Sequence, residues 1–293
     1  MAESEIGPGK THRDENFPVA SLLIAPRHRG PILAFYRFAR AADDVADHPT
    51  LPATEKLARL DALDATLTGA SDAAAPALAL RRALGERGLT PRHGQDLLKA
   101  FRQDVTKRRY RDFDDLIEYC VYSAMPVGRF VLDVHGESRA TWPASDALCA
   151  ALQVINHLQD CAADYLRLDR VYIPLDALSR HGVSVEALAT APGSPGLRGC
   201  IAELAERTSR LLEEAAPLAG LVADLRLGLE ISVIQALARR LTRMLRRRDP
   251  LSERVHLTAS GAAAIAATAI GTGIVRRTAR RLGIVRHATA QGA

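Results

Sequence analysis

Residues 153–164 read QVINHLQDCAAD and place polar side chains among apolar ones at helical spacing. Each residue of an α-helix is turned by about 100° from the one before it, so positions i, i+3, i+7 and i+11 lie within an arc of roughly 80°. The surrounding Ala, Val, Ile and Leu side chains suit a buried helix. Carboxylates on such a helix are costly unless they meet cations. The stretch therefore predicts a helix with a functional face, formed by Gln153, Asn156, Asp160 and Asp164.

Residues 31–47 read PILAFYRFARAADDVAD and predict a second helix with acidic residues near its end. The preceding Gly30 together with Pro31 is typical of a helix start. Asp43 and Asp47 lie at i and i+4 and therefore share one face. The dipole at a helix C-terminus disfavours carboxylates, and a bound divalent cation reverses that effect. The alternative interpretation is an exposed acidic helix end without a ligand.

Together, the two aspartate pairs predict a metal site between two helices. Asp160 and Asp164 repeat the i, i+4 spacing of Asp43 and Asp47. Mg²⁺ prefers oxygen ligands, commonly one or two carboxylates together with phosphate oxygens of a substrate. Two facing pairs would hold several Mg²⁺ ions, which would neutralise the charge of a departing diphosphate.

The rest of the chain predicts a single all-α domain. Helical patterns alternate with Gly- and Pro-containing breaks, and we find no alternating strand pattern and no repeat of fixed period. The pattern over 113–134 contains Met125-Pro126-Val127-Gly128, which predicts a kink. We expect a disordered lead-in at 1–14, the domain at 15–284 and a basic and polar tail at 285–293. The other predicted helices are 16–25, 51–67, 74–84, 91–107, 143–168, 197–215, 218–247 and 258–274.

Composition indicates an ordinary soluble chain in a reducing compartment. Hydrophobic residues make up 47% and charged residues 25% of the 293 residues. The four cysteines have no metal-binding spacing, and the N-terminus lacks the apolar core of a signal peptide. We therefore expect a cytoplasmic protein, with peripheral contact at the inner membrane left open. Aromatic residues make up only 4%, and no nucleic-acid-binding motif is present, so no nucleic acid is expected as a partner.

Arginine supplies most of the cations in a chain whose formal net charge is +5. Two basic clusters lie at 239–248 and 276–281. They are either solvated helix faces or surfaces that attract an anionic membrane or a diphosphate substrate. Between them, residues 258–274 are rich in Ala, Gly and Ile but short for a membrane span. We expect this segment to form a final packed helix.

Several motifs resemble those of the squalene/phytoene synthases, and the resemblance extends over residues 15–260. They are YRFARAADDVAD at 36–47, YC at 119–120, PVGR at 126–129, QxxNxxxDxxxD at 153–164 and DRVYIP at 169–174. Within this family of isoprenoid synthases, the sequence is most similar to the bacterial HpnC type of the hopanoid pathway. ENFPVAS at 15–21, AFRQDV at 100–105, NHLQD at 156–160 and DPLSERV at 249–255 carry that finer resemblance.

The resemblance implies an all-α isoprenoid-synthase (terpenoid-synthase) fold, a helical bundle with a central cavity. It implies that several Mg²⁺ ions are ligated by Asp43, Asp47, Asp160 and Asp164. It implies diphosphate binding by Ser21, Arg40, Arg170 and Gln153. It implies catalytic positions at Tyr119, Tyr172 and Asn156. The planar fork of a guanidinium suits diphosphate oxygens, which is in keeping with the two arginines.

The reaction that the resemblance implies is the conversion of presqualene diphosphate and water to hydroxysqualene and diphosphate. A partner enzyme would make presqualene diphosphate from two farnesyl diphosphates, and another would reduce hydroxysqualene, so association with both is expected. One alternative is a squalene or phytoene synthase that condenses two prenyl diphosphates itself. Another is a non-catalytic assembly or scaffold protein. Intact aspartates at all four metal positions argue against the last.

Two features bear on the choice between these reactions. The chain has no Gly-rich dinucleotide fingerprint, and NADPH is not expected as a cofactor. Gln159 stands where condensing relatives often have Arg, which favours the hydroxysqualene reaction. Met125 stands where HpnC-like proteins have Asn. Its flexible side chain either packs at the predicted kink or alters how water is placed near the substrate.

Other side chains near these motifs have structural and functional interpretations. Tyr119 and Tyr122 lie at i and i+3, either in the core or at a cavity wall where a phenol positions water. His157 lies about 100° from Asn156, off the polar face, and is expected to be structural. Asp104 either supports the site or lies at the surface.

Overall fold

The computed structural model describes residues 23–281, which form an all-α bundle. No β-strand occurs among these residues, and a single parallel bridge joins Arg109 to Val171. The predicted lead-in, the predicted tail, most of the predicted 16–25 helix and Ser21 lie outside the described residues. The helices in chain order are α1 (Pro26–Ala46), α2 (Ala53–Thr68), α3 (Ala75–Gly85), α4 (Arg92–Asp104), α5 (Phe113–Ser123), α6 (Met125–His135), η1 (Arg139–Thr141), α7 (Trp142–Leu168), α8 (Leu175–Arg180), η2 (Val185–Ala189), α9 (Pro195–Glu214), α10 (Leu218–Leu221), α11 (Leu225–Leu245) and α12 (Ala259–Arg281).

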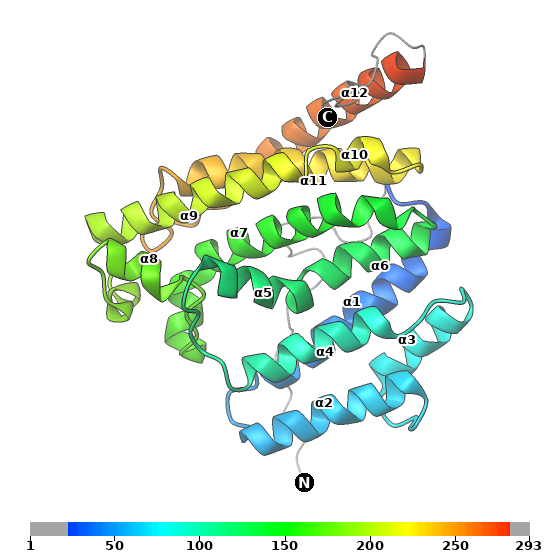
Figure 1. The fold of residues 1–293 in the computed structure, drawn as a ribbon, viewed down its shortest axis with the longest axis horizontal. Coiled ribbons are helices and arrows are strands. Elements are labelled where there is room, and N and C mark those ends of the chain that lie inside the picture. Colours follow the sequence, from blue (N-terminus) through cyan, green and yellow to red (C-terminus); the bar gives the residue numbers. More distant parts are fainter. Residues whose placement is uncertain (1–22, 282–293) are drawn as a thin grey trace, which may run out of the picture.

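The helix α7 lies in the middle of the bundle (Figure 1). It packs against α5 and α6 on one side and against α9 and α11 on the other. The helices α1 to α4 lie together at one end of the bundle, and α12 is outermost at the opposite end. Apolar side chains between these layers form one large core, as expected for stacked amphipathic helices.

The central position of α7 follows from the pattern of its side chains. Val154, Ile155 and Leu158 are at most 2% exposed and belong to the main core. The predicted polar face is half-buried at each of its four positions, so it borders the core and is reached by solvent. The sequence-based prediction of a helix over 143–168 is confirmed.

The predicted 113–134 helix is divided at Ala124 into α5 and α6. Ala124 has φ −129° and ψ −47°, outside helical geometry, and Pro126 follows in the first turn of α6. Met125 packs in a small cluster with Cys120 and Ala150. Of its two interpretations, packing at the break is therefore the one that the structure supports.

Gly128 lets α6 approach α7 closely. A Cβ atom at this position would lie 2.4 Å from Ser145 Oγ and 2.5 Å from Cys149 Sγ, closer than non-bonded atoms approach. One residue on, the guanidinium of Arg129 donates from Nε and Nη2 to the two carboxylate oxygens of Asp146 at 2.8 and 2.6 Å. This two-point pair fixes the register of α6 on α7.

The segment 218–247 differs from the single helix that was predicted. It forms the short α10 and the long α11, separated by Val222, Ala223 and Asp224. The carboxylate of Glu137 accepts hydrogen bonds from the backbone N–H groups of Ala223 and Asp224 at 2.7 and 2.8 Å. Asp224 in turn caps α11 by accepting from Leu227 N–H. A distant carboxylate therefore stabilises the break, and local periodicity could not reveal it.

The last helix corrects the expectation of a packed helix over 258–274. The helix α12 is longer than predicted and contacts α11 along one side only. Ala269 packs with Val233 and Leu237, whereas Ile274 and Val275 are 48% and 67% exposed. Residues Ala259–Ala279 are long and apolar enough to cross a membrane by length and composition alone, and 6% of that apolar stretch is buried.

Candidate active site

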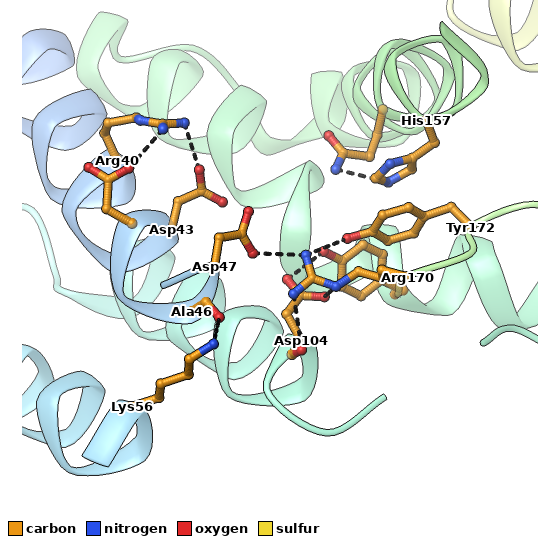
Figure 2. A network of polar contacts seen from close by, with 12 residues as sticks. Arg40, Asp43, Ala46, Asp47, Lys56, Asp104, His157, Arg170 and Tyr172 are labelled. Atoms are coloured by element: carbon orange, nitrogen blue, oxygen red, sulfur yellow. Dashed lines mark hydrogen bonds and ion pairs between the residues drawn. The ribbon is translucent and has the colours of Figure 1, made fainter. Parts of the chain in front are cut away.

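The first aspartate pair lies at the C-terminal end of α1 and is accompanied by two arginines. Arg40 donates from Nη1 to Asp43 and from Nη2 to Asp44, both at 2.7 Å. Asp47 accepts from Arg170 Nη1 at 2.9 Å, across 123 residues of sequence. Figure 2 shows Asp43 and Asp47 side by side, with Arg40 beyond the first and Arg170 beyond the second. The pair is therefore not an isolated acidic helix end.

The chemistry of this donor set fits a divalent cation. Burial and, secondarily, the neighbouring Asp47 carboxylate raise the pKa of Asp43 to about 7, even though Arg40 opposes the shift. A divalent cation bound beside this carboxylate would replace the water that burial has removed and would favour the deprotonated form. Lys56 donates to the carbonyl oxygen of Ala46 at 2.8 Å and adds a positive charge at the helix end.

The loop after α7 brings Arg170 to this end of α1. Asp169 has a left-handed φ of 49° and ends the helix, and Arg170 N–H returns to the carbonyl oxygen of Asp164 at 3.2 Å. Val171 N–H donates to Arg108 O at 2.9 Å, so the loop runs beside the segment before α5. The side chains of Arg108 and Arg109 both bind the Asp169 carboxylate, at 2.9 and 2.5 Å. These contacts fix the direction in which Arg170 leaves the loop.

Arg170 is 6% exposed, and its guanidinium is shared among several protein groups. Besides Asp47, it donates from Nη1 to Tyr172 Oη at 3.2 Å and from Nη2 to the backbone oxygen of Asp104 at 3.1 Å. Its Nε atom lies 4.0 Å from Asp104 Oδ1. In this arrangement Arg170 connects α1, α4 and the loop after α7. The Nε atom itself has no hydrogen-bond partner among the described residues.

Asp104 is a buried acid at the centre of the site. Its carboxylate accepts from Tyr119 Oη at 2.8 Å. Burial raises its pKa to about 7, and the charge of Arg170 limits that rise. Its Oδ1 atom has no hydrogen-bond partner among the described residues. Of the two interpretations of Asp104, the structure supports the one in which it supports the site.

Aromatic rings form the wall next to Arg170. His157 stacks on Tyr172 with ring centroids 3.5 Å apart, and Tyr172 in turn lies 5.4 Å from Tyr110 and 5.7 Å from Tyr119. Burial raises the pKa values of Tyr119 and Tyr172 well above the ordinary value for tyrosine, so both phenols are neutral at physiological pH. The wall therefore presents neutral hydroxyl groups next to the charged guanidinium of Arg170.

His157 links this wall to the polar face of α7. Burial and the nearby Arg170 charge lower its pKa to about 3, so the imidazole is neutral. Its Nε2 lies 3.1 Å from Gln153 Nε2, and the neutral ring accepts the amide hydrogen there. A continuous series of contacts thus runs from Asp47 through Arg170, Tyr172 and His157 to Gln153. Figure 2 shows His157 and Tyr172 across the site from Asp43 and Asp47.

The second aspartate pair lies further along α7. Asn156, Asp160 and Asp164 are all half-buried on the face that begins with Gln153. Asp160 borders a hollow of about 400 Å³ formed with residues 250–256. Over residues 23–281, no group of three or more His, Cys, Asp or Glu side chains is close enough to hold one metal ion. Each pair would therefore complete its coordination with oxygens from elsewhere, which is how Mg²⁺ is commonly bound with phosphate substrates.

Gln159 points away from the aromatic wall. It is 7% exposed, and its amide donates to the backbone oxygen of Val255 in the segment that follows α11. The contact ties the DPLSERV segment to α7 beside Asp160. An effect of Gln159 on the site would therefore pass through the position of that segment.

The motifs point to the aspartates, Arg170, Tyr119 and Tyr172 as candidate site residues, and the structure places further side chains beside them. Asp104 was left open, His157 was interpreted as structural, and Lys56 was not considered. Each meets the site through a partner on another helix or loop, so helical spacing alone carried no signal for it. The AFRQDV stretch at 100–105 was the available signal for Asp104.

The comparisons with known proteins show the family of the chain. The sequence model of the squalene/phytoene synthase family matches residues 10–260. A hydroxysqualene synthase of Rhodopseudomonas palustris is 59% identical over 274 residues, which cover 94% of each chain. The hydroxysqualene synthase of Zymomonas mobilis is 52% identical over 250 residues, which cover 85% of this chain and 84% of that protein.

Solved structures show the same fold. A crystal structure of the squalene synthase HpnC of Alicyclobacillus acidocaldarius has a TM-score of 0.70 at 33% identity, covering 78% of this chain and 87% of that one. A dehydrosqualene synthase in complex with a ligand has a TM-score of 0.77 at 20% identity, covering 89% and 92%. The helical bundle is thus the terpenoid-synthase fold that the sequence predicted. The chain belongs to the squalene/phytoene synthase family.

Proposed function

We propose that this protein converts presqualene diphosphate and water to hydroxysqualene, diphosphate and a proton. The carbon–oxygen bond to diphosphate breaks, the carbon skeleton rearranges as a cation, and a water oxygen forms the new bond as its proton leaves. The observation that carries the proposal is the Asp43–Asp47 pair with Arg40 and Arg170, set beside a wall of neutral aromatic side chains. The names of its relatives in Rhodopseudomonas, Sinorhizobium and Zymomonas support it.

Mg²⁺ is the metal that we propose for the site. Asp43 and Asp47 would hold it at the end of α1, and Asp160 and Asp164 would hold it on α7. When bound, Mg²⁺ supplies charge neutralisation for the departing diphosphate. The half-buried positions of the α7 pair leave room for substrate oxygens to complete the coordination.

The arginines differ in what they offer a diphosphate. Arg40 is half-buried and pairs with Asp43 and Asp44 on its own helix, so its donors are near the solvent-reached side of the site. Arg170 is buried and keeps Asp47 in place. We therefore assign direct binding of the diphosphate mainly to Arg40, together with Gln153 and Ser21. Arg170 would contribute to diphosphate binding through Asp47, which it keeps in place.

The neutral wall suits a carbocation that must survive rearrangement. Neutral Tyr119, Tyr172 and His157 do not offer an anionic nucleophile, and aromatic faces stabilise cations. Asn156 lies one helical turn from Gln153, at the junction of this wall with the aspartates, and is the residue that we assign to orienting water. Excluding bulk water until rearrangement is complete would prevent early quenching.

The proposal extends to partners. An enzyme that makes presqualene diphosphate must precede this one, and a reductase must follow it. Transfer of such lipophilic molecules would favour association among the three proteins, and peripheral contact with a membrane, because each intermediate is poorly soluble in water. The reaction itself transfers no hydride, so NADPH is not required.

Product analysis tests the proposed reaction. Purified protein with Mg²⁺ would be incubated with presqualene diphosphate, farnesyl diphosphate or geranylgeranyl diphosphate, each with and without NADPH, and products identified by mass spectrometry. We expect hydroxysqualene from presqualene diphosphate alone, independent of NADPH. Squalene or phytoene formed from the shorter diphosphates would instead show a condensing synthase. A lack of turnover with all three would favour the scaffold alternative.

A further inference from the structure

The groove between α11 and α12 brings together arginines from both basic clusters. It is about 870 Å³ in volume and is also bordered by α10. We call it the arginine groove, defined by Arg239, Arg240, Arg243, Arg276 and Arg277. Arg243 and Arg276 are separated by 33 positions in the sequence, and folding brings the two groups to one surface.

The charge of the arginine groove is not balanced locally. None of the residues that line it is acidic. Arg239, Arg240 and Arg243 are exposed, and no described carboxylate pairs with them. Arg277 donates to the backbone oxygens of Val222, Ala223 and Asp224, which fixes the end of α12 over the start of α11. A cationic groove of this kind attracts anions, and its geometry is set by backbone contacts.

An apolar surface lies directly beside the groove. The side of α12 that faces away from α11 exposes Ala263 and Ala267, followed by Ile274 and Val275 at 48% and 67% exposure. Figure 1 shows α12 as the outermost helix, with no other helix beyond it. A helix with one packed side, one exposed apolar side and arginines at its end has the character of an interfacial helix.

We propose that the α11–α12 face docks on an anionic phospholipid bilayer. Lipid phosphate groups occupy the arginine groove, and the outer side of α12 enters the headgroup layer. Nucleic acid would satisfy the arginines but leave the apolar side of α12 exposed. A second copy of the chain, placed symmetrically on this face, would bring arginines against arginines. A bilayer surface satisfies both features at once, and the proposal does not depend on which reaction the site performs.

Vesicle flotation tests this docking. The full chain is mixed with vesicles of phosphatidylcholine alone, or of phosphatidylcholine and phosphatidylglycerol in equal amounts. We expect the protein to float with the second kind and to remain unbound with the first. Binding should weaken as salt is raised, because the attraction is partly electrostatic. Equal binding to both kinds, or to neither, would overturn the proposal.

Two sets of variants locate the docking surface. Replacing Arg239, Arg240 and Arg243 together by Gln should weaken binding by on the order of a hundredfold, since each arginine near an anionic surface contributes about fivefold. The control replaces Arg59, Arg82 and Arg92 by Gln, which removes the same charge from exposed positions on α2 to α4 at the other end of the molecule. Equal losses in both triple variants would show attraction by net charge alone and contradict the proposed face.

The apolar side is tested separately. Ile274→Asp together with Val275→Asp should weaken vesicle binding about tenfold, while circular dichroism and turnover in detergent stay unchanged because both side chains are exposed. Unchanged vesicle binding would contradict a role for α12 in docking. Protein that resists extraction from vesicles by alkaline carbonate would indicate a spanning helix, and this result would also overturn the proposal.

Discussion

The two aspartate pairs share one spacing but lie in different surroundings. At the end of α1, Asp43 and Asp47 are each paired with an arginine, and one of these arginines is buried. On α7, Asp160 has no ion pair with a described basic side chain and borders a hollow. The first pair is therefore positioned by the protein itself. On α7, Asp160 borders space that a ligand can enter, and we expect metal and diphosphate to join the two pairs.

The largest expected effect concerns the aspartate pair on α7, Asp160 and Asp164. Asp160→Asn removes a proposed metal ligand and should reduce turnover by about a thousandfold, the equivalent of several kcal/mol of transition-state stabilisation. The free energy of unfolding should stay within about 0.5 kcal/mol, because no ion pair with a described side chain is lost. Steady-state turnover and urea unfolding check both values.

Asp114→Asn is the matched control for that substitution. Its side chain is 95% exposed and meets only Arg207, at 3.7 Å. We expect full activity and unchanged stability. Strong activity in Asp160→Asn would contradict the proposal that the α7 pair binds metal. The proposed metal site would then consist of the α1 pair alone.

Arg170→Lys should reduce both turnover and the free energy of unfolding, because it disturbs the site at the end of α1. Lysine keeps the charge but cannot reach Asp47, Tyr172 and the Asp104 backbone together. We expect about 2 kcal/mol lower stability and turnover reduced by roughly a hundredfold. Arg109→Lys, at an exposed pair with Asp169, should cost less than about 1 kcal/mol. Equal losses in the two variants would show that Arg170 has no special positioning role.

Tyr119→Phe tests the buried support beneath Arg170. The substitution removes the 2.8 Å hydrogen bond to Asp104 and leaves that carboxylate with one donor fewer. We expect a loss of about 1–3 kcal/mol in the free energy of unfolding, measured in urea. Tyr122→Phe, at a half-buried position three residues away, should be close to neutral. If both variants matched the unchanged protein, the Asp104–Tyr119 contact would not contribute to stability.

The effect that is smallest at neutral pH concerns His157, and it grows only as the pH falls. Its folded pKa of about 3 is below the ordinary 6.5, so the unfolded chain binds more protons between these values, and stability contributed by the neutral ring is lost as pH falls below 6.5. His157→Phe keeps an aromatic ring on Tyr172 and removes this titration.

The slope of stability against pH should differ between His157→Phe and the unchanged protein by about 1.4 kcal/mol per pH unit below pH 6.5. Asp43 and Asp104, with pKa values of about 7, titrate in the opposite sense in both proteins, so only the difference between the proteins reports on His157. Parallel slopes would show that the imidazole does not titrate with a lowered pKa.

The sequence predicted the helices that carry the site because their signals are local. The i, i+4 aspartates and the apolar surround of 153–164 need only neighbouring residues to be interpreted, and both helices are confirmed. The predicted start at Gly30-Pro31 is wrong, because α1 begins at Pro26 and Pro31 lies inside it. The terpenoid-synthase fold and the family followed from motifs within those helices. The assignment of the four aspartates to metal stays a prediction.

What the sequence could not predict depends on contacts between distant residues. Arg170 meets Asp47 across 123 residues, and Tyr119 meets Asp104 from another helix. His157 was interpreted from its angle on α7, but its role is set by stacking on Tyr172 from the following loop. The exposure of α12 likewise depends on which helices cover it, which its own composition does not reveal.

Calorimetric titration of diphosphate tests most directly whether diphosphate and metal bind to both aspartate pairs at once. Inorganic diphosphate would be titrated into the unchanged protein, Asp47→Asn and Asp160→Asn, each with Mg²⁺ and with a chelator. We expect binding to the unchanged protein only with Mg²⁺, weakened at least tenfold in each variant, because each pair supplies part of the coordination. Equal binding in the presence of the chelator, or binding unaffected by either substitution, would contradict the account.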